Sequence, residues 1–296
     1  MREAILPSRE SAVEAFLLGA PRLKVSAACV ADAGPVVDGH CVATNLLWEI
    51  HERRLAAAVC APVRLSNDLE AAAHGVLALP PEKFLVLQSG TPNPGRNMAL
   101  IAAGTGLGQA LMVPDGQGYG VVPSQGGHAD FAPRDELQMD LYRFLRAEFN
   151  HESWERVLSA PGLANIERIL QARAGHAAPD WLRERLQRED HGVIVGEVGL
   201  SGRDSVCAEA LDLSVPIYGA GAGQPRARDP GLGRTRRGRR YRAQDPGRAL
   251  RRALHGGVPP TGRLDSLLSS VPVRVALDPR APQHSSKRHE RRRAPA

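Results

Sequence analysis

Apolar and polar residues alternate along the first part of the chain in short segments that predict a mixed α/β protein. A Ser-x-x-Glu pattern that begins at Ser11, with apolar residues on one helical face, predicts an amphipathic helix capped by Ser11. Residues 24–45 contain β-rich runs separated by Gly-Pro and Asp-Gly turns, which are typical of hairpins. The same pattern then predicts helices at 49–59 and 69–79, strands at 62–68 and 83–90, and two strands around a Gly-rich turn within 97–113.

A longer helix with a buried stripe is predicted farther along the chain. Leu137, Leu141, Leu145 and Phe149 recur at a spacing of four residues within 135–149, which places them on one helical face. We therefore expect this helix to pack against a core.

The patterning stops after residue 222 and returns only once. Residues 223–260 are rich in Arg, Gly and Pro and have almost no apolar periodicity, a composition typical of disordered segments. From the whole pattern we predict five segments: a small α/β domain at 1–78, a large α/β domain at 79–222, a disordered segment at 223–260, a patterned return at 261–282 and a basic tail at 283–296.

The charge of the chain follows the same division. The 296 residues carry a formal net charge of +6. Residues 226–252 contain eleven Arg and two Asp, and residues 287–293 contain five basic residues and one Glu, so the rest of the chain has a net charge of −7. The body is thus acidic, and we do not expect it to bind nucleic acid.

The cysteines and the apolar content narrow the class further. The four cysteines form no Cys-x-x-Cys pair and have no histidines at metal-ligand spacing around them, so we expect neither disulfides nor a metal site. No stretch is long and apolar enough for a membrane helix, and the N-terminus lacks a signal-peptide pattern. These features predict a cytoplasmic protein that does not contact a membrane.

Four short motifs could carry chemistry, and each also has a purely structural interpretation. Gly104, Thr105 and Gly106 form a turn that could bind phosphate through backbone amides, or a plain β-turn. Asn67 and Asp68 lie where a strand meets a helix, so they could present a catalytic base or simply cap the helix.

The other two motifs lie farther along the chain. Residues 121–133 place Gln125 and His128 around a Gly-Gly pair, which favours either a ligand site or a hairpin turn with a solvated histidine. Glu155 lies in a helical stretch and would by itself be a solvated surface residue.

The order and spacing of these motifs resemble the bacterial ATP-dependent glucokinase family. The resemblance covers about residues 6–223 and again 262–281, and it rests on the segments GPVVDGHCVATNLLW, LSNDLEAAAHG, LIAAGTGLGQA, PSQGGHADFAPRDE and ERVLSAPGLANI. It implies an actin-like, hexokinase-like ATPase fold (ribonuclease H-like), in which two α/β domains flank a cleft and which is incomplete here.

The resemblance also implies a role for each matching residue. Asp68 would be the general base for the 6-hydroxyl of glucose; Asn67, Gln125, His128 and Glu155 would bind sugar hydroxyls; and Gly104, Thr105 and Gly106 would contact the phosphates of ATP. It further implies Mg²⁺ as the cofactor of ATP, a place in glycolysis and possible assembly as a homodimer. The alternative is that the chain is a non-catalytic, degenerate kinase body whose Arg-rich segment binds nucleic acid or has a regulatory role.

Three features depart from the family pattern. Gln125 stands where the family has Glu, and no Asp-x-Gly-Gly-Thr strand and turn precedes the first matching segment, so we expect an N-terminally truncated member. The Arg-rich block replaces a Gly-Asn-Leu-Ala-Leu helix and a Gly-Gly-Val strand. With suitable codons, residues 223–230 read one nucleotide out of frame spell Gly-Asn-Leu-Ala-Leu-Glu-Ile-Leu, so we expect this block and the basic tail to be frame-altered.

Overall fold

A computed structural model describes residues 7–19, 24–43, 48–91, 95–228, 232–239 and 270–277. Contacts between Cα atoms divide the chain into two compact units. The described residues of unit 1 lie within Met1–Leu79, and those of unit 2 lie within Pro80–Pro279. The domain boundary predicted at residue 78 lies next to this division.

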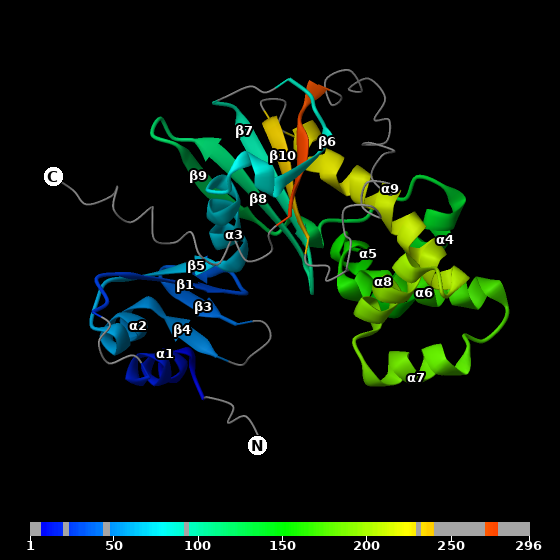
Figure 1. Ribbon diagram of the computed structural model, residues 1–296, viewed down its shortest axis with the longest axis horizontal. Coiled ribbons are helices and arrows are strands. Elements are labelled where there is room, and N and C mark those ends of the chain that lie inside the picture. The colour runs from blue at the N-terminus through cyan, green and yellow to red at the C-terminus, as the bar shows by residue number, and fades with distance from the viewer. Residues whose placement is uncertain are drawn as a thin grey trace. The chain divides into compact units, whose positions relative to one another are not determined.

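The described residues of unit 1 form three helices and five short strands, which Figure 1 labels in part. In chain order they are α1 (Arg9–Leu18), β1 (Ala28–Asp32), β2 (Val36–Val37), β3 (His40–Val42), β4 (Glu49–His51), α2 (Glu52–Val59), β5 (Val63–Asn67) and α3 (Asp68–Leu77). β1 and β5 form a parallel pair, whereas β2, β3 and β4 form an antiparallel sheet. A small core that includes Cys41, Ile50 and Leu55 fills this unit.

Two predicted boundaries in unit 1 are wrong. The cap of α1 is Ser8, because its hydroxyl accepts a hydrogen bond from the backbone of Ser11 (3.2 Å) while the Ser11 hydroxyl accepts one from the Ser8 backbone (3.1 Å). The helix predicted at 49–59 begins at Glu52, because Glu49–His51 pairs with β3 instead.

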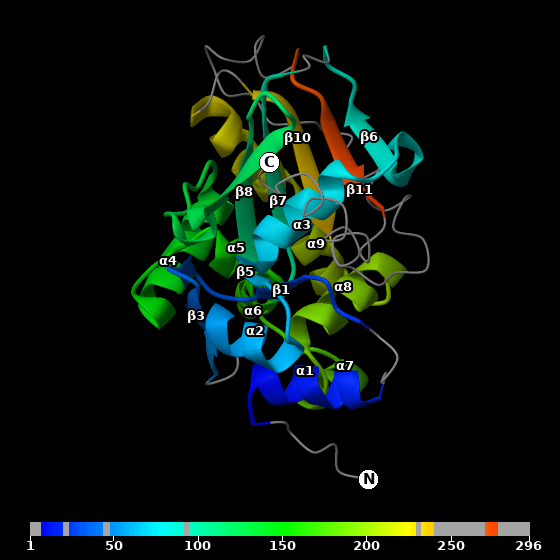
Figure 2. The same cartoon turned by 90° about the vertical axis from the view of Figure 1, so that its left-hand side faces the viewer.

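Unit 2 contains most of the helices and a larger sheet. In chain order its elements are η1 (Pro81–Lys83), β6 (Phe84–Gln88), β7 (Asn97–Ala103), β8 (Leu107–Pro114), β9 (Tyr119–Ser124), η2 (Gly126–His128), α4 (Glu136–Phe149), α5 (Glu155–Leu158), α6 (Ala160–Ala174), α7 (Asp180–Arg188), α8 (His191–Ser201), α9 (Ser205–Arg228), β10 (Leu232–Arg239) and β11 (Val273–Ala276). The strand order is β6-β11-β10-β7-β8-β9. Figure 2 shows β6, β11, β10, β7 and β8 in this order.

The helices of unit 2 pack mainly on one another around a large apolar core. α6, α8 and α9 contact each other and bury residues such as Ile166, Ile194 and Val195. The helix predicted at 135–149 is confirmed, with Asp135 as its cap and with Leu141 and Leu145 fully buried. No helix among the described residues is both long and apolar enough to cross a membrane.

The structure differs from the predicted disorder of 223–260 wherever it describes that segment. Helix α9 continues to Arg228, and Leu232–Arg239 forms β10 between β7 and β11, parallel to both. Sequence composition missed this strand because its pairing partners lie far away in the chain. β11 confirms the strand predicted within the patterned return at 261–282. Outside the described residues lie the rest of 223–260, most of 261–282 and the tail at 283–296.

Candidate active site

In unit 1, the polar candidates gather at the carboxyl ends of two parallel strands. β1 and β5 run side by side in a register that pairs Asp32 with Asn67, and Asp68 opens α3 directly afterwards. Side chains at this edge of a parallel pair are well placed for ligands, because helix N-termini and strand ends meet there. The predicted pair Asn67 and Asp68 therefore lies where an α/β protein commonly binds its substrate.

The side chain of Asn67 fixes this edge through both of its polar atoms. Its Oδ1 accepts a hydrogen bond from the backbone of Leu69 (2.9 Å), which caps α3, and its Nδ2 donates one to the carbonyl of Gly34 (2.8 Å). The capping interpretation of Asn67 is thus confirmed. An amide nitrogen has two protons and an amide oxygen has two lone pairs, so the side chain keeps one donor and one acceptor site beyond these bonds.

One carboxylate at this edge, that of Asp32, was not predicted from the sequence. Asp32 is 6% exposed, pairs with Arg9 and accepts a hydrogen bond from the backbone of Ala33 (2.9 Å). The pKa of the Cys41 thiol is raised, first by burial and then by the carboxylates of Asp32 and Asp68, so both acids act on the same thiol. An acid at the end of a strand, before Gly34-Pro35, was the available signal.

In unit 2, the Gly-Thr-Gly turn joins β7 to β8. The amide of Gly104 donates to the carbonyl of Gly106 (2.8 Å), and the carbonyl of Gly104 accepts from the amide of Ala160 (2.8 Å). Thr105 is exposed at the tip. The turn is therefore fixed on both sides and presents Thr105 outward.

Glu155 packs directly against this turn. Its Oε2 accepts a hydrogen bond from the amide of Leu107 (2.9 Å), and a Cβ added at Gly106 would lie 2.6 Å from the same oxygen. Its Oε1 lies 4.0 Å from Nδ1 of His128. The side chains of His128 and Glu155 are 60% and 32% exposed, so both remain accessible to a solute. Glu155 is therefore more than a solvated surface residue, because its carboxylate is held by the backbone of β8.

A short backbone pairing brings Glu155 and His128 together. The amide of Phe131 donates to the carbonyl of Glu152 (2.7 Å), and the amide of Trp154 donates to the carbonyl of Ala129 (2.9 Å). The rings of Phe131 and Trp154 meet edge to face beneath this pairing, with centroids 5.3 Å apart. Residues that follow η2 and residues that precede α5 are therefore fixed side by side.

The Gly-Gly pair before His128 does not form the alternative hairpin turn, and it permits a close contact between η2 and β8. Neither Gly126 nor Gly127 has a positive φ, and the two open the single turn η2 rather than a hairpin. A Cβ on Gly126 would lie 2.3 Å from Oε1 of Gln109, and one on Gly127 would lie 2.0 Å from the carbonyl of Leu107. Only glycine permits this close approach of η2 to β8.

Among the predicted residues, the structure brings Gly106, His128 and Glu155 into one group in unit 2. Gln125 caps η2 at the edge of this group and is exposed. The buried Gln109, which the sequence analysis missed, supports η2 from β8. The arrangement offers a carboxylate, an imidazole and an amide around a backbone turn, which suits a ligand rich in hydroxyl groups.

Solved structures show which class of protein this fold belongs to. A glucokinase from an Antarctic psychrotroph matches with a TM-score of 0.74 and 25% identity over 95% of this chain and 84% of that one. A glucokinase of the ROK family from Streptomyces griseus, in complex with glucose and AMPPNP, matches with a TM-score of 0.57 and 20% identity over 93% of this chain and 86% of that one. The fold is that of the hexokinase-like, actin-like ATPases.

Sequence comparisons assign the family. A family model described as Glucokinase matches residues 2–226. A glucokinase from Synechocystis sp. is 36% identical over 89% of this chain and 78% of its own length, and one from Nostoc sp. is 38% identical over 66% of this chain and 61% of its own length. The chain belongs to the glucokinase family, and it spans about three fifths to four fifths of the length of these relatives.

Proposed function

We propose that this chain transfers the γ-phosphoryl group of ATP to the 6-hydroxyl of glucose. Family membership supports the reaction class, and the group formed by Glu155, His128 and Gly106 supports the substrate. A carboxylate accepts hydrogen bonds from sugar hydroxyls, and an imidazole can donate or accept one. The adjoining backbone turn suits phosphate. The observation that carries the proposal is the contact of the Glu155 carboxylate with the Gly-Thr-Gly turn.

Each side chain then has one role. Asp68 takes the proton from the attacking 6-hydroxyl, and Asn67 binds a neighbouring hydroxyl with its remaining donor and acceptor sites. Gln125, His128 and Glu155 bind further sugar hydroxyls. Positioning and charge stabilisation supply most of the rate in phosphoryl transfer, so a fixed set of such residues is sufficient.

The nucleotide roles fall on the turn between β7 and β8. Because the Gly104 amide is already bonded within the turn, the amides of Thr105 and Gly106 and the Thr105 hydroxyl are the groups that meet the phosphates. Asp32 and Asp68 lie at one strand edge, and their carboxylates would hold Mg²⁺, an ion that is otherwise bound mainly by phosphate oxygens and water. The ion would supply neutralisation of the charge on the phosphates.

Location, pathway and assembly are also matters of proposal. We propose a cytoplasmic enzyme that acts in glycolysis and assembles as a homodimer. The alternative, a non-catalytic nucleic-acid-binding or regulatory protein, gains no support from the family match.

A paired substitution tests the proposed base. Asp68→Asn should lower kcat for glucose phosphorylation by about 10²–10⁴-fold, because the amide cannot take a proton. Asp180→Asn makes the same chemical change at a side chain that is 86% exposed and should leave kcat unchanged. Equal rates for wild type and Asp68→Asn, measured by coupled detection of ADP, would remove Asp68 from the mechanism.

A further inference from the structure

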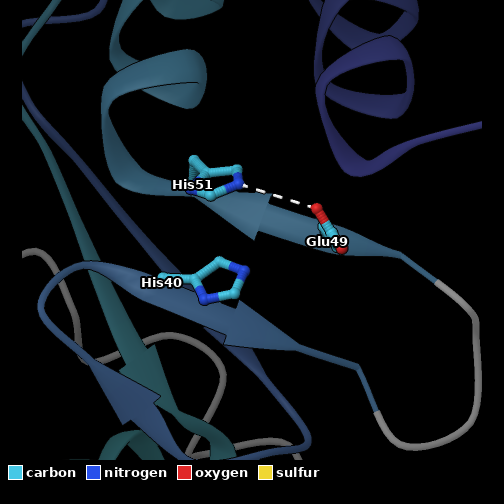
Figure 3. A group of neighbouring side chains, drawn as sticks. All are labelled: His40, Glu49 and His51. Carbon is cyan, nitrogen blue, oxygen red and sulfur yellow. Dashed lines mark ion pairs between the residues drawn. The ribbon is translucent and has the colours of Figure 1, made fainter.

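A second cluster of ligating side chains lies on the small antiparallel sheet of unit 1, away from Asn67 and Asp68 in the sequence. His40 is on β3, and Glu49 and His51 are on β4 (Figure 3). One ligand atom from each of the three lies within 4.8 Å of the other two. No role in the proposed phosphoryl transfer falls on any of them.

Strand register explains why these three residues meet. His40 lies directly opposite His51, and Glu49 lies two positions before His51 on the same strand. Because side chains alternate along a strand, His40, Glu49 and His51 share one face. The alternate residues Cys41 and Ile50 are 1% and 0% exposed, so the core fixes the opposite face and with it the register.

The local contacts leave donor atoms available. The two imidazole rings lie face to face, with centroids 4.4 Å apart and an interplanar angle of 18° (Figure 3). Nε2 of His51 is 4.0 Å from Oε2 of Glu49. Nε2 of His40 is buried yet finds no hydrogen-bond partner among the described residues. A buried polar atom without a partner is unfavourable, and a bound cation would remove that penalty.

We propose that His40, Glu49 and His51 form a binding site for a divalent transition-metal ion of the Zn²⁺ class. Two imidazoles and one carboxylate are donors that Zn²⁺ prefers, with water as a fourth ligand, whereas Mg²⁺ prefers oxygen donors. Tetrahedral Zn²⁺ needs ligand atoms roughly 3.4 Å apart, given Zn–N distances of about 2.0–2.1 Å. The ligand atoms now lie 4.0 Å apart between His51 and Glu49 and up to 4.8 Å apart within the group, so the side chains must rotate to bring these atoms about 0.6–1.4 Å closer when an ion binds.

The ion would join the two strands of a short hairpin. Glu49 is 69% exposed and can turn toward the imidazoles without leaving a buried position, and His51 is immediately followed by α2. Metal binding therefore links β3 to β4 and the start of α2 and stabilises the folded form of unit 1. This site is separate from the Mg²⁺ that accompanies ATP.

Zn²⁺ affinity of the full chain, measured by competition with a chromophoric chelator, tests the proposal. We expect one ion whose affinity falls at least tenfold in His40→Ala and in His51→Ala, and by a smaller factor in Glu49→Gln. His176→Ala removes an exposed histidine of unit 2, and Cys60→Ser removes an exposed thiol; both should retain wild-type affinity for this ion. Absence of binding, or equal affinity in wild type and both histidine variants, overturns the proposal.

A second readout does not depend on affinity alone. Co²⁺ bound by two imidazoles, a carboxylate and water gives the visible absorption of a four-coordinate ion, and Zn²⁺ should raise the melting temperature of the wild-type chain. His51→Ala should lose both signals while keeping the melting temperature of the metal-free wild type. Retention of the Co²⁺ spectrum in His51→Ala would place the ion elsewhere and refute the site.

Discussion

Gly106→Ala should damage sugar binding through Glu155, although residue 106 itself has no side chain to lose. The added Cβ would lie 2.6 Å from Oε2 of Glu155, and real Cβ contacts essentially never fall below 3.0 Å. Gly104 lies in the same turn, but a Cβ added there meets nothing within 4 Å. Neither glycine has a positive φ, so backbone strain does not distinguish the two substitutions.

The structure sets the size of the effect. To relieve the contact, the carboxylate must move from 2.6 Å to between 3.0 and 3.4 Å, which stretches or breaks its 2.9 Å bond to the Leu107 amide. A hydrogen bond to a charged group contributes about 1.5–3 kcal/mol when well shielded, so at this half-exposed site we expect a loss of about 1 kcal/mol in folding free energy. Misplacing a binding group by up to about 1 Å should lower kcat/KM for glucose by roughly tenfold to hundredfold.

The assay compares five proteins by thermal unfolding and by glucose kinetics: wild type, Gly106→Ala, Gly104→Ala, Glu155→Gln and the double variant Gly106→Ala with Glu155→Gln. Gly104→Ala should keep the wild-type KM for glucose and the wild-type melting temperature. The double variant Gly106→Ala with Glu155→Gln should be little worse than either single variant, because both act on the same carboxylate. Wild-type glucose kinetics in Gly106→Ala, together with loss of activity in Glu155→Gln, would contradict this account of the contact.

Three further predictions concern stability. Asn67→Ala should lower the free energy of unfolding by about 1–2 kcal/mol in urea titrations, whereas Asn67→Asp should lose only part of this, because it keeps the cap on Leu69 and loses the donor to Gly34. Burial raises the pKa of Cys207 from 9.0 to about 12, so the protonated thiol stabilises the fold below pH 9, and this contribution should fall by about 1.4 kcal/mol per pH unit between pH 9 and 12. The stability difference between wild type and Cys207→Ala should therefore shrink over that range, and a constant difference would contradict it. Replacing residues 223–260 by the displaced-frame sequence should raise the melting temperature, because β10 lies between β7 and β11, where apolar residues are favoured. An equal or lower melting temperature would show that the Arg-rich sequence suits this strand.

Local signals in the sequence predicted the elements whose stability is local. Leu141 and Leu145 recur on one helical face, and Asp135 precedes them as a cap, so α4 was predicted to within a residue of its observed bounds. The strand that ends at Asn67 and the helix that follows it were predicted for the same reason. Ser8 and Ser11 are both good caps, and only the reciprocal bonds of the folded chain decide between them.

Features that depend on pairing between distant segments were not predicted from the sequence. The composition of Leu232–Arg239 predicts disorder, yet its backbone pairs with strands that lie more than a hundred residues earlier and more than thirty residues later. The contact of Glu155 with Gly106 depends on the pairing beside Trp154, and the meeting of His40 with His51 depends on strand register. None of these contacts has a periodic signal along the chain.

The central claim, that this chain phosphorylates glucose with ATP, is tested most directly by identifying the product. The purified chain would be incubated with ¹³C-labelled glucose, ATP and Mg²⁺, and the product followed by ¹³C and ³¹P NMR. The account predicts glucose 6-phosphate and ADP in equal amounts, formed by wild type and by Asp180→Asn and reduced about 10²–10⁴-fold in Asp68→Asn. A folded wild-type chain that forms no sugar phosphate, or a product phosphorylated at another hydroxyl, would contradict it.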